Sequence, residues 1–416
     1  MNPFMTALSS MLLLALSYSL QASTETSGKL IIAGGAISKS STEIFDLFVK
    51  KSGGKQAKIG IIPAATGSIG KQYSLLEKAF TRAGVSLASI HLLPLATKDD
   101  KKTKPDEGLW IHNGNNKNIA QQVESLTGIW FIGGDQTLIT KVLLNEDGSD
   151  TKVLRAIRQL YINGGVIGGT SAGAAIMSES MIAGGNSQGA LFEGIGHSYT
   201  SMDEQEYGPV VSNKGLGFFS DGIIDQHFDR KGRLGRLVVT LLNNAQFDFG
   251  FGVDEGTAML VEHGKINVIG EGGVTIVDVS SASDFEPKKL PVSASNIRLS
   301  FLQPGDSFDL SKYSLTAREN AAKTVNHEYF NIPAQSVSGL VNANRNLDEF
   351  IGYDLLDNQA TNEVSSWVIN GSDAIKMTFS QDNSSQGYWS TDVTADVYSF
   401  ENVRMDIKPI KIQFLE

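Results

Sequence analysis

Residues 164–177 read Gly-Gly-Val-Ile-Gly-Gly-Thr-Ser-Ala-Gly-Ala-Ala-Ile-Met, and this stretch decides how the rest of the chain is interpreted. The apolar run at 164–167 predicts a buried strand, and the small residues after it allow a sharp turn into a helix. Gly169 and Gly173 flank Ser171 with the spacing of a nucleophile elbow, in which a serine hydroxyl projects from a tight strand-to-helix turn. The backbone N–H of Ala172 then points at a forming oxyanion. An ordinary glycine-rich turn is the alternative.

Strands and helices alternate on the N-terminal side of this stretch. Short apolar runs predict strands at 29–33, 58–63, 89–95 and 128–132. Helical spacing of apolar residues predicts helices at 41–52, 73–83, 116–125, 137–144 and 151–163. This alternation is typical of a three-layer α/β/α fold with a mostly parallel, doubly wound sheet.

Three turns of small residues follow predicted strands: Gly34-Gly35, Gly133 to Gln136, and Gly169 to Gly173. In sheets of this kind, ligands bind beyond the carboxyl ends of the strands. The three turns therefore predict one active site.

The remainder of the chain is less regular. Residues 178–220 are rich in Gly, Ser and acids, and predict loops with a short element. Further predicted elements are strands at 223–228, 249–253, 259–262, 265–270, 273–279, 297–302 and 308–310, and a helix at 232–243. The strands at 259–262, 265–270 and 273–279 are short and predicted to be antiparallel, and those at 297–302 and 308–310 are predicted to close the domain. Toward the C-terminus the apolar residues show no clear helical or strand period. We interpret residues 313–416 as an extension that is partly β.

Composition narrows the class of protein. The chain has 416 residues, 41% hydrophobic and 19% charged, which is typical of a globular protein with a sizeable core. A net charge of −10 argues against nucleic-acid binding. The absence of cysteine excludes disulfides, thiolate metal sites and a cysteine nucleophile. We expect no cofactor and no metal.

The N-terminus predicts export. Residues 5–20 form an apolar run, and a polar stretch follows from Ser23 to Ser27. This pattern predicts a secretory signal peptide cleaved after Ala22, with a secreted or periplasmic product. A short membrane anchor is the alternative, although the run falls short of the about 20 residues that a span requires. No later segment is long and apolar enough to span a bilayer, so we expect no membrane contact after cleavage.

A serine nucleophile needs a base and a carboxylate that orients the base. His227 follows a predicted strand and lies beside Asp225. A structural histidine is the equal alternative from the residues alone. Asp254 and Glu255 follow another predicted strand, and either one is a candidate for the orienting carboxylate, with Glu255 narrowly preferred. The alternative for this pair is a solvated acidic turn.

A basic cluster follows His227. It contains Arg230, Lys231, Arg233 and Arg236, and the last two share a helix face because they are three residues apart. Guanidinium groups bind carboxylates well, so the cluster predicts a ligand that carries carboxylates. A solvated helix start is the alternative.

Together these motifs resemble cyanophycinase. The resemblance rests on four segments in family order: Gly133 to Gln136, Gly168 to Ala174, Asp225 to Phe228 with Arg233 and Arg236, and Val253 to Glu255. Cyanophycinases are serine peptidases related to aspartyl dipeptidase, with a class I glutamine amidotransferase-like (flavodoxin-like) α/β/α fold. The apolar N-terminus and long C-terminal tail are similar to the secreted branch of the family.

The resemblance implies hydrolysis of cyanophycin, a poly-aspartate backbone with arginine on its side chains, to β-Asp-Arg dipeptides. It assigns Ser171 as nucleophile, His227 as general base and Glu255 as orienting acid. The oxyanion donors are expected near Ala172 and Gly134.

The implied substrate pocket contains Gln136, Asp225, Gln226, Arg233 and Arg236. Lys231 stands where the family usually carries arginine, and lysine lacks the bidentate geometry. The expected partners are the polymer or β-Asp-Arg peptides. The assembly is left open, with a homodimer as one option.

The chain is accordingly divided into a signal peptide at 1–22, a cyanophycinase-like α/β domain at 23–312, and a C-terminal extension at 313–416 of unknown role. Two rival functions stay open: an aspartyl dipeptidase-like peptidase acting on short peptides, and a non-catalytic protein that binds polymer or peptides. The main hypothesis expects hydroxyl, imidazole and carboxylate to meet above the same edge of one sheet.

Overall fold

The computed structural model describes residues 28–37, 42–198, 205–333, 337–338, 347–391 and 396–413. The predicted signal peptide lies outside these ranges, so export stays a prediction. Within them, no helix combines the length and the apolar character needed to cross a membrane.

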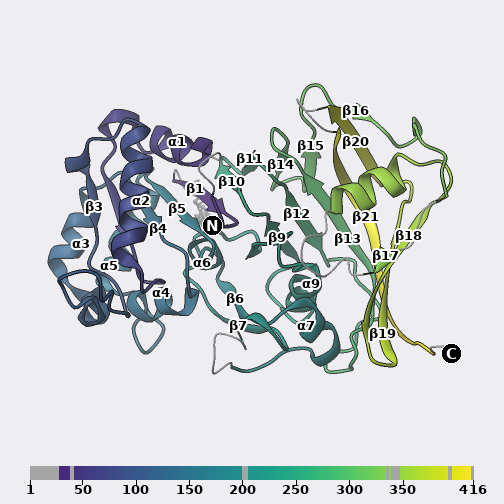
Figure 1. The fold of residues 1–416 in the computed structure, drawn as a ribbon, viewed down its shortest axis with the longest axis horizontal. Coiled ribbons are helices and arrows are strands. Elements are labelled where there is room, and N and C mark those ends of the chain that lie inside the picture. The colour runs from purple at the N-terminus through teal and green to yellow at the C-terminus, as the bar shows by residue number, and fades with distance from the viewer. Residues whose placement is uncertain are drawn as a thin grey trace, which may run out of the picture.

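Two large β-sheets lie side by side in the described part of the chain (Figure 1). The first sheet has the strand order β15-β14-β11-β10-β1-β5-β4-β2-β3. Its strands are β1 (Lys29–Ala33), β2 (Ile59–Ile62), β3 (Ile90–Leu92), β4 (Gly128–Phe131), β5 (Val166–Thr170), β10 (Thr257–Glu262), β11 (Lys265–Gly270), β14 (Ser307–Asp309) and β15 (Ser314–Thr316). The strands from β1 to β3 in this order run parallel, whereas β10, β11, β14 and β15 add antiparallel to the β1 edge.

Helices cover both faces of the parallel part, at the left of Figure 1. They are α1 (Thr42–Lys51), α2 (Ile69–Arg82), α3 (Lys117–Glu124), α4 (Gln136–Leu143) and α5 (Lys152–Ile162). Side chains of a strand alternate between faces. Leu30 and Ile32 accordingly pack in the cluster with α3, α4 and α5, while Ile31 and Ala33 pack with α1 and α2. The predicted α/β/α layers are confirmed.

The second sheet has the order β17-β18-β19-β21-β13-β12-β9-β8. Its strands are β8 (Ile223–Gln226), β9 (Phe249–Val253), β12 (Val274–Asp278), β13 (Ala294–Leu302), β17 (Val337–Ser338), β18 (Glu363–Asn370), β19 (Asp373–Ser380) and β21 (Asp396–Lys411). In addition, β20 (Gln386–Thr391) pairs with β21 and β16 (Ala322–Lys323) pairs with β20. β8 and β9 are parallel neighbours. The expectation that all site-bearing strands share one sheet is therefore wrong, because β8 pairs with β9 and β9 pairs with β12, and neither pairs with β1.

Residues beyond 313 take part in both sheets. β15 pairs with β14 in the first sheet, and β21 pairs with β13 in the second. A π-helical segment, η4 (Asp348–Leu356), packs on the second sheet through Phe350, Ile351 and Leu355. The division of the chain at residues 312 and 313 stays a prediction.

Between the two sheets, the segment expected to be mostly loop is more regular than predicted. It contains β6 (Ser180–Gly184), α7 (Ser187–Glu193) and β7 (Val211–Lys214), with β6 and β7 paired as an antiparallel ribbon. α7 packs against α9 (Leu234–Leu242), beside β8 and β9. This region supplies one wall of a charged pocket.

Candidate active site

Ser171 lies in the turn between β5 and α6 (Ala172–Ala175), with φ 55° and ψ −113°. A positive φ is unfavourable for a residue with a side chain and is typical of strained functional turns. The flanking positions must be glycine because the backbone segments before and after Ser171 lie very close together. A Cβ on Gly169 would come within 2.3 Å of the Gly173 carbonyl oxygen. The predicted elbow is thus present in the backbone.

Ser171, His227 and Glu255 form one hydrogen-bonded chain. The Ser171 Oγ lies 2.8 Å from His227 Nε2, and His227 Nδ1 lies 2.5 Å from a Glu255 carboxylate oxygen. A carboxylate only accepts, so Nδ1 carries the proton and Nε2 is left to accept from the Ser171 hydroxyl. The arrangement is that of a nucleophile, a base and a group that orients the base.

The three side chains come from different sheets. Ser171 ends β5 in the first sheet, whereas His227 follows β8 in the second. Glu255 lies in the turn that carries the chain from β9 of the second sheet to β10 of the first. The groups therefore meet at the junction of two sheets and not above one sheet edge, as the sequence had suggested.

The glycine turn after β1 holds the imidazole. The His227 amide donates to the Gly34 carbonyl over 2.8 Å, and the Gly256 amide donates to the Gly35 carbonyl over 2.9 Å. Gly35 has φ +130°, and a Cβ there would lie 2.2 Å from His227 Cε1. A glycine is needed because the ring rests on the backbone.

Burial lowers the pKa of His227, and the positive charges of Arg233 and Lys231 lower it further, while Glu255 opposes the shift. The net direction is downward from the ordinary value. The imidazole is therefore neutral at neutral pH and can take a proton from Ser171.

The expected oxyanion donors are the backbone amides of Ala172, next to Ser171 in the chain, and of Gly134. Ala172 is the first residue of α6, where amides have no partner within the helix. Gly134 lines the same cavity of ≈ 890 Å³ as Ser171 and His227. Gly134 has φ +143°, a conformation that favours glycine. A Cβ at this position would lie 2.1 Å from the Ala65 carbonyl oxygen, so a side chain does not fit. Phe45 and Leu76 also line this cavity.

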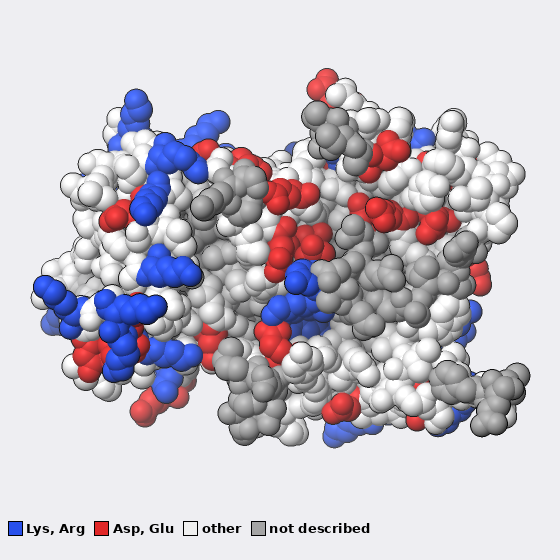
Figure 2. Space-filling model, in the orientation of Figure 1, with Lys and Arg blue, Asp and Glu red and all other residues white. Residues whose placement is uncertain are grey.

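A second cavity, of ≈ 640 Å³, adjoins Glu255 and is strongly charged. Figure 2 shows acidic and basic side chains side by side near the middle of this face, between the two sheets. The cavity is lined by Glu206, Arg230, Lys231 and Arg233. Lys231 Nζ lies 2.6 Å from one oxygen of Glu206, and the Arg233 guanidinium lies 3.3 Å from the other. Burial, together with the charge of Arg236, lowers the pKa of Arg233 to about 9.

Asp225 and Arg236 lie beneath this cavity in a bidentate ion pair, with nitrogen–oxygen distances of 2.8 and 2.5 Å. Their side chains are 1% and 2% exposed. The third guanidinium nitrogen donates to the Gly185 carbonyl over 2.7 Å. Burial alone would raise the pKa of Asp225, but the charge and hydrogen bonds of Arg236 hold it below the ordinary value. The polar atoms of both predicted substrate residues are engaged with the protein.

The two glutamines that were predicted to line the substrate pocket differ in their hydrogen bonding. Gln136 is buried at the start of α4, and its amide nitrogen donates to the carbonyls of Ile182 and Ala183. Gln226 is 5% exposed, and its Oε1 has no hydrogen-bond partner among the described residues. Gln226 therefore offers a buried acceptor, whereas Gln136 supports β6.

The choice between Asp254 and Glu255 follows from geometry. Glu255 contacts His227, while the Asp254 carboxylate accepts from the amides of Asp229 and Gly273. Glu206 was not singled out in the sequence, because the segment around it has no period. Within the described ranges, no group of three or more histidines and acids is arranged to hold a metal ion.

Comparisons with known proteins identify the family. Residues 30–269 match the family model described as Peptidase family S51, and this range includes Ser171, His227 and Glu255. A cyanophycinase of Geminocystis herdmanii is 33% identical over 68% of this chain and 93% of its own length. A cyanophycinase of Synechococcus elongatus is 30% identical over 69% of this chain and 81% of its own length. A solved peptidase from an acI-B1 Actinobacterium is 20% identical, with a TM-score of 0.46, over 68% of this chain and 96% of its own.

Proposed function

This chain belongs to peptidase family S51 and is a serine peptidase, and on that premise we propose that it hydrolyses cyanophycin to β-Asp-Arg dipeptides. The observation that carries the proposal is the hydrogen-bonded chain from Ser171 through His227 to Glu255, beside a pocket with cations for carboxylates. Its relatives at about a third identity are cyanophycinases, and they are matched over most of their length.

The reaction proceeds in two halves. Ser171 Oγ attacks the backbone carbonyl carbon while His227 Nε2 takes the hydroxyl proton. His227 then gives that proton to the leaving amine, the C–N bond breaks, and an acyl-enzyme ester remains on Ser171. In the second half His227 takes a proton from water, the hydroxide attacks the ester, and the proton returns to Ser171 Oγ as the acid product leaves. Glu255 stabilises the transient imidazolium through Nδ1.

The oxyanion of each tetrahedral intermediate is stabilised by the Ala172 amide together with a glycine amide near Gly134. Each such donor contributes roughly 3 kcal/mol to lowering the barrier. Arg233 and Lys231 bind carboxylates of the substrate's arginines, because both carboxyls of each aspartate are in amide bonds within the polymer. The Oε1 of Gln226, which has no partner among the described residues, accepts a hydrogen bond from the substrate. Asp225, Arg236 and Gln136 form the floor that holds these contacts in place.

The test is incubation of the purified chain with insoluble cyanophycin and, separately, with α-Asp dipeptides. Clearing of the polymer with β-Asp-Arg as product, and no cleavage of α-Asp dipeptides, is expected. Cleavage of α-Asp dipeptides alone would favour an aspartyl dipeptidase-like activity. Binding of polymer without any product would favour a non-catalytic protein.

We also propose that the protein is exported from the cytoplasm. The apolar run at residues 5–20 and the polar stretch after it support cleavage after Ala22. The mature product is expected outside the cytoplasm with Ser23 as its first residue, which N-terminal peptide mapping checks. Recovery in the membrane fraction with residues 1–22 intact would favour an anchor instead.

A further inference from the structure

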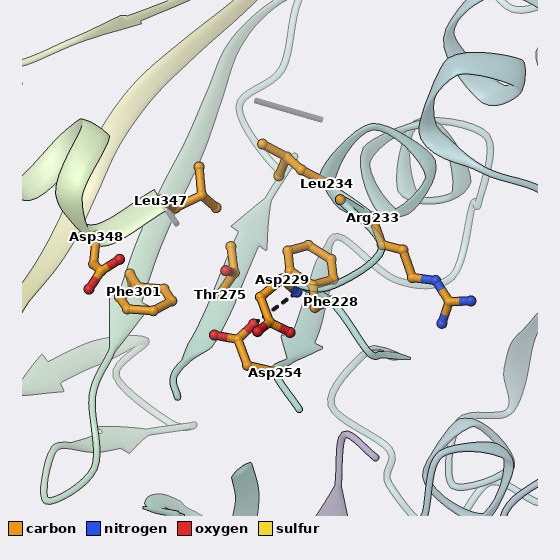
Figure 3. Close-up of a pocket in the computed structure, with 10 residues that line it drawn as sticks. Phe228, Asp229, Arg233, Leu234, Asp254, Thr275, Phe301, Leu347 and Asp348 are labelled. Carbon is orange, nitrogen blue, oxygen red and sulfur yellow. Dashed lines mark hydrogen bonds between the residues drawn. The ribbon is translucent and has the colours of Figure 1, made fainter. Parts of the chain in front are cut away.

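The loops that carry His227 and Glu255 are tied to each other by a reciprocal pair of hydrogen bonds. The Asp229 amide donates to the Asp254 carboxylate over 3.2 Å, and the Glu255 amide donates to the Asp229 carboxylate over 3.0 Å. Figure 3 shows the two carboxyl groups next to each other, with the first of these bonds drawn. Each aspartate therefore uses its side chain to hold the backbone of the other loop.

The pair is anchored on its far side. The second oxygen of Asp254 accepts from the Gly273 amide over 2.9 Å, next to the start of β12. Asp254 is only 6% exposed, whereas Asp229 is half-buried. The loop that carries Glu255 is thus connected both to the His227 loop and to the second sheet.

The β-ladder alone does not reach these residues. The parallel pairing of β8 and β9 ends at Gln226 and Val253, and the last backbone bond between the loops joins the Phe228 amide to the Val253 carbonyl over 3.2 Å. His227 itself has φ 48°, an unfavourable conformation that the surroundings must maintain. Something beyond the ladder has to set the distance between imidazole and carboxylate.

We propose that Asp229 and Asp254 are positioning residues, which clasp the two loops together so that His227 and Glu255 stay at hydrogen-bonding distance. This proposal rests on the proposed serine mechanism, because its effect passes through those two side chains. Neither aspartate contacts the Ser171 hydroxyl in the structure, and both act through backbone amides. A misplacement of about 1 Å in such a site lowers the rate about 100-fold.

The surroundings of the clasp explain how two acids can lie side by side. Burial, and then the charge of Asp229, raises the pKa of Asp254 well above its ordinary value. A neutral Asp254 still accepts from both amides and does not repel Asp229. Asp348 of η4 lines the same small cavity of ≈ 30 Å³, and its carboxyl accepts from the Gln303 side chain over 2.9 Å. Within the described residues, Asp348 makes no hydrogen bond to either loop, which makes it a matched control.

The experiment compares Asp229→Ala with Asp229→Asn, because asparagine keeps the accepting Oδ1 and alanine does not. Two readouts are used: steady-state hydrolysis of cyanophycin, and the rate at which diisopropyl fluorophosphate labels Ser171, followed by peptide mass spectrometry. Asp229→Ala is expected to lower kcat and the labelling rate about 10- to 100-fold, with KM within about twofold. Asp229→Asn should recover most of the loss, and Asp348→Asn should match the unmodified chain in both readouts.

A double variant separates positioning from a general effect on folding. In a Glu255→Ala background the clasp has no carboxylate to position. Adding Asp229→Ala should then lower the labelling rate further by less than about threefold. If Asp229→Ala does not fold, the isosteric Asp254→Asn replaces it; one accepting oxygen becomes a donor, and a partial loss of labelling rate is expected.

Several results would overturn the clasp. One is labelling of Asp229→Ala and Asp254→Asn at the unmodified rate, and another is an Asp229→Asn variant as slow as the alanine variant. The others are an equally slow Asp348→Asn variant, and an effect of Asp229→Ala on the labelling rate that is as large in the Glu255→Ala background as in the unmodified chain. Absence of labelling at Ser171 in the unmodified chain would instead remove the proposed nucleophile, and the clasp with it. Failure of the clasp alone leaves that labelling intact.

Discussion

The charged pocket has a floor and a rim that use the same kinds of residue in opposite ways. The floor is the ion pair of Asp225 with Arg236, whose side chains are 1% and 2% exposed. The rim is the ion pair of Glu206 with Lys231, whose side chains are 38% and 37% exposed. Both pairs have nitrogen–oxygen contacts close to 2.5 Å, so distance does not distinguish them.

Solvent exposure distinguishes them instead. A buried pair is costly to break, because the partner left behind is an uncompensated charge without water. An exposed pair contributes about 0–1 kcal/mol to stability, since water replaces either partner easily. The floor therefore holds the shape of the pocket, and under the proposed function the rim exchanges its contacts with those of a substrate.

The largest expected effect comes from breaking the floor. Arg236→Ala leaves Asp225 buried, with the Arg233 guanidinium 3.7 Å away. We expect the free energy of unfolding to fall by about 3–5 kcal/mol, measured by urea denaturation. The matched rim variant, Lys231→Ala, should change it by no more than about 1 kcal/mol. Equal losses for the two variants would remove the distinction between floor and rim.

Breaking the rim should change substrate binding and leave the fold intact. Lys231→Ala removes a cation that the proposal assigns to a substrate carboxylate, so KM for soluble cyanophycin fragments should rise about 10-fold, about the value of one hydrogen bond to a charged group. kcat should stay within about twofold, since Lys231 does not touch Ser171. An unchanged KM would place the substrate elsewhere.

A smaller effect is expected from Lys231→Arg, which restores the residue usual in the family. The guanidinium keeps the charge and adds bidentate geometry toward a carboxylate. Substrate binding should be unchanged or tighter, as measured by KM on the same fragments. A clear loss of affinity would mean that the shorter ammonium contact with Glu206 is itself the requirement.

The smallest expected effect is on pH dependence. Burial and the charges of Arg233 and Lys231 lower the pKa of His227, and the base acts only when neutral. The acid limb of kcat/KM should therefore have its midpoint below the ordinary histidine value of about 6.5. Lys231→Met removes one of these charges and should move the limb to higher pH, whereas Lys231→Arg should not. A limb that stays in place in Lys231→Met would show that the rim and the base are not coupled.

Part of the candidate site was predictable because it depends on local backbone chemistry. A serine between glycines after an apolar run predicts a tight strand-to-helix turn, and the turn at Ser171 has the predicted shape. The layers of the first sheet followed from the alternation of short apolar strands with helices. Gly34 and Gly35 form the turn that the sequence predicts, whereas their contact with His227 depends on how distant segments pack and is not visible in the sequence.

Other features depend on pairings that one sequence does not reveal. Nothing local shows that Asp225 and Arg236 face each other, and so both were expected to contact substrate. β8 and β9 have the apolar character of any buried strand, which does not specify their sheet. The C-terminal residues did carry a signal that was missed: Val403, Met405 and Ile407 are buried and alternate with polar neighbours along β21.

The most direct test of the serine mechanism is the hydrolysis rate of Ser171→Ala on cyanophycin, measured beside its thermal unfolding. The account predicts a loss of about 10⁴-fold or more in kcat with an unchanged melting temperature and retained binding to the polymer. A variant that folds normally and still releases β-Asp-Arg at the unmodified rate would contradict it.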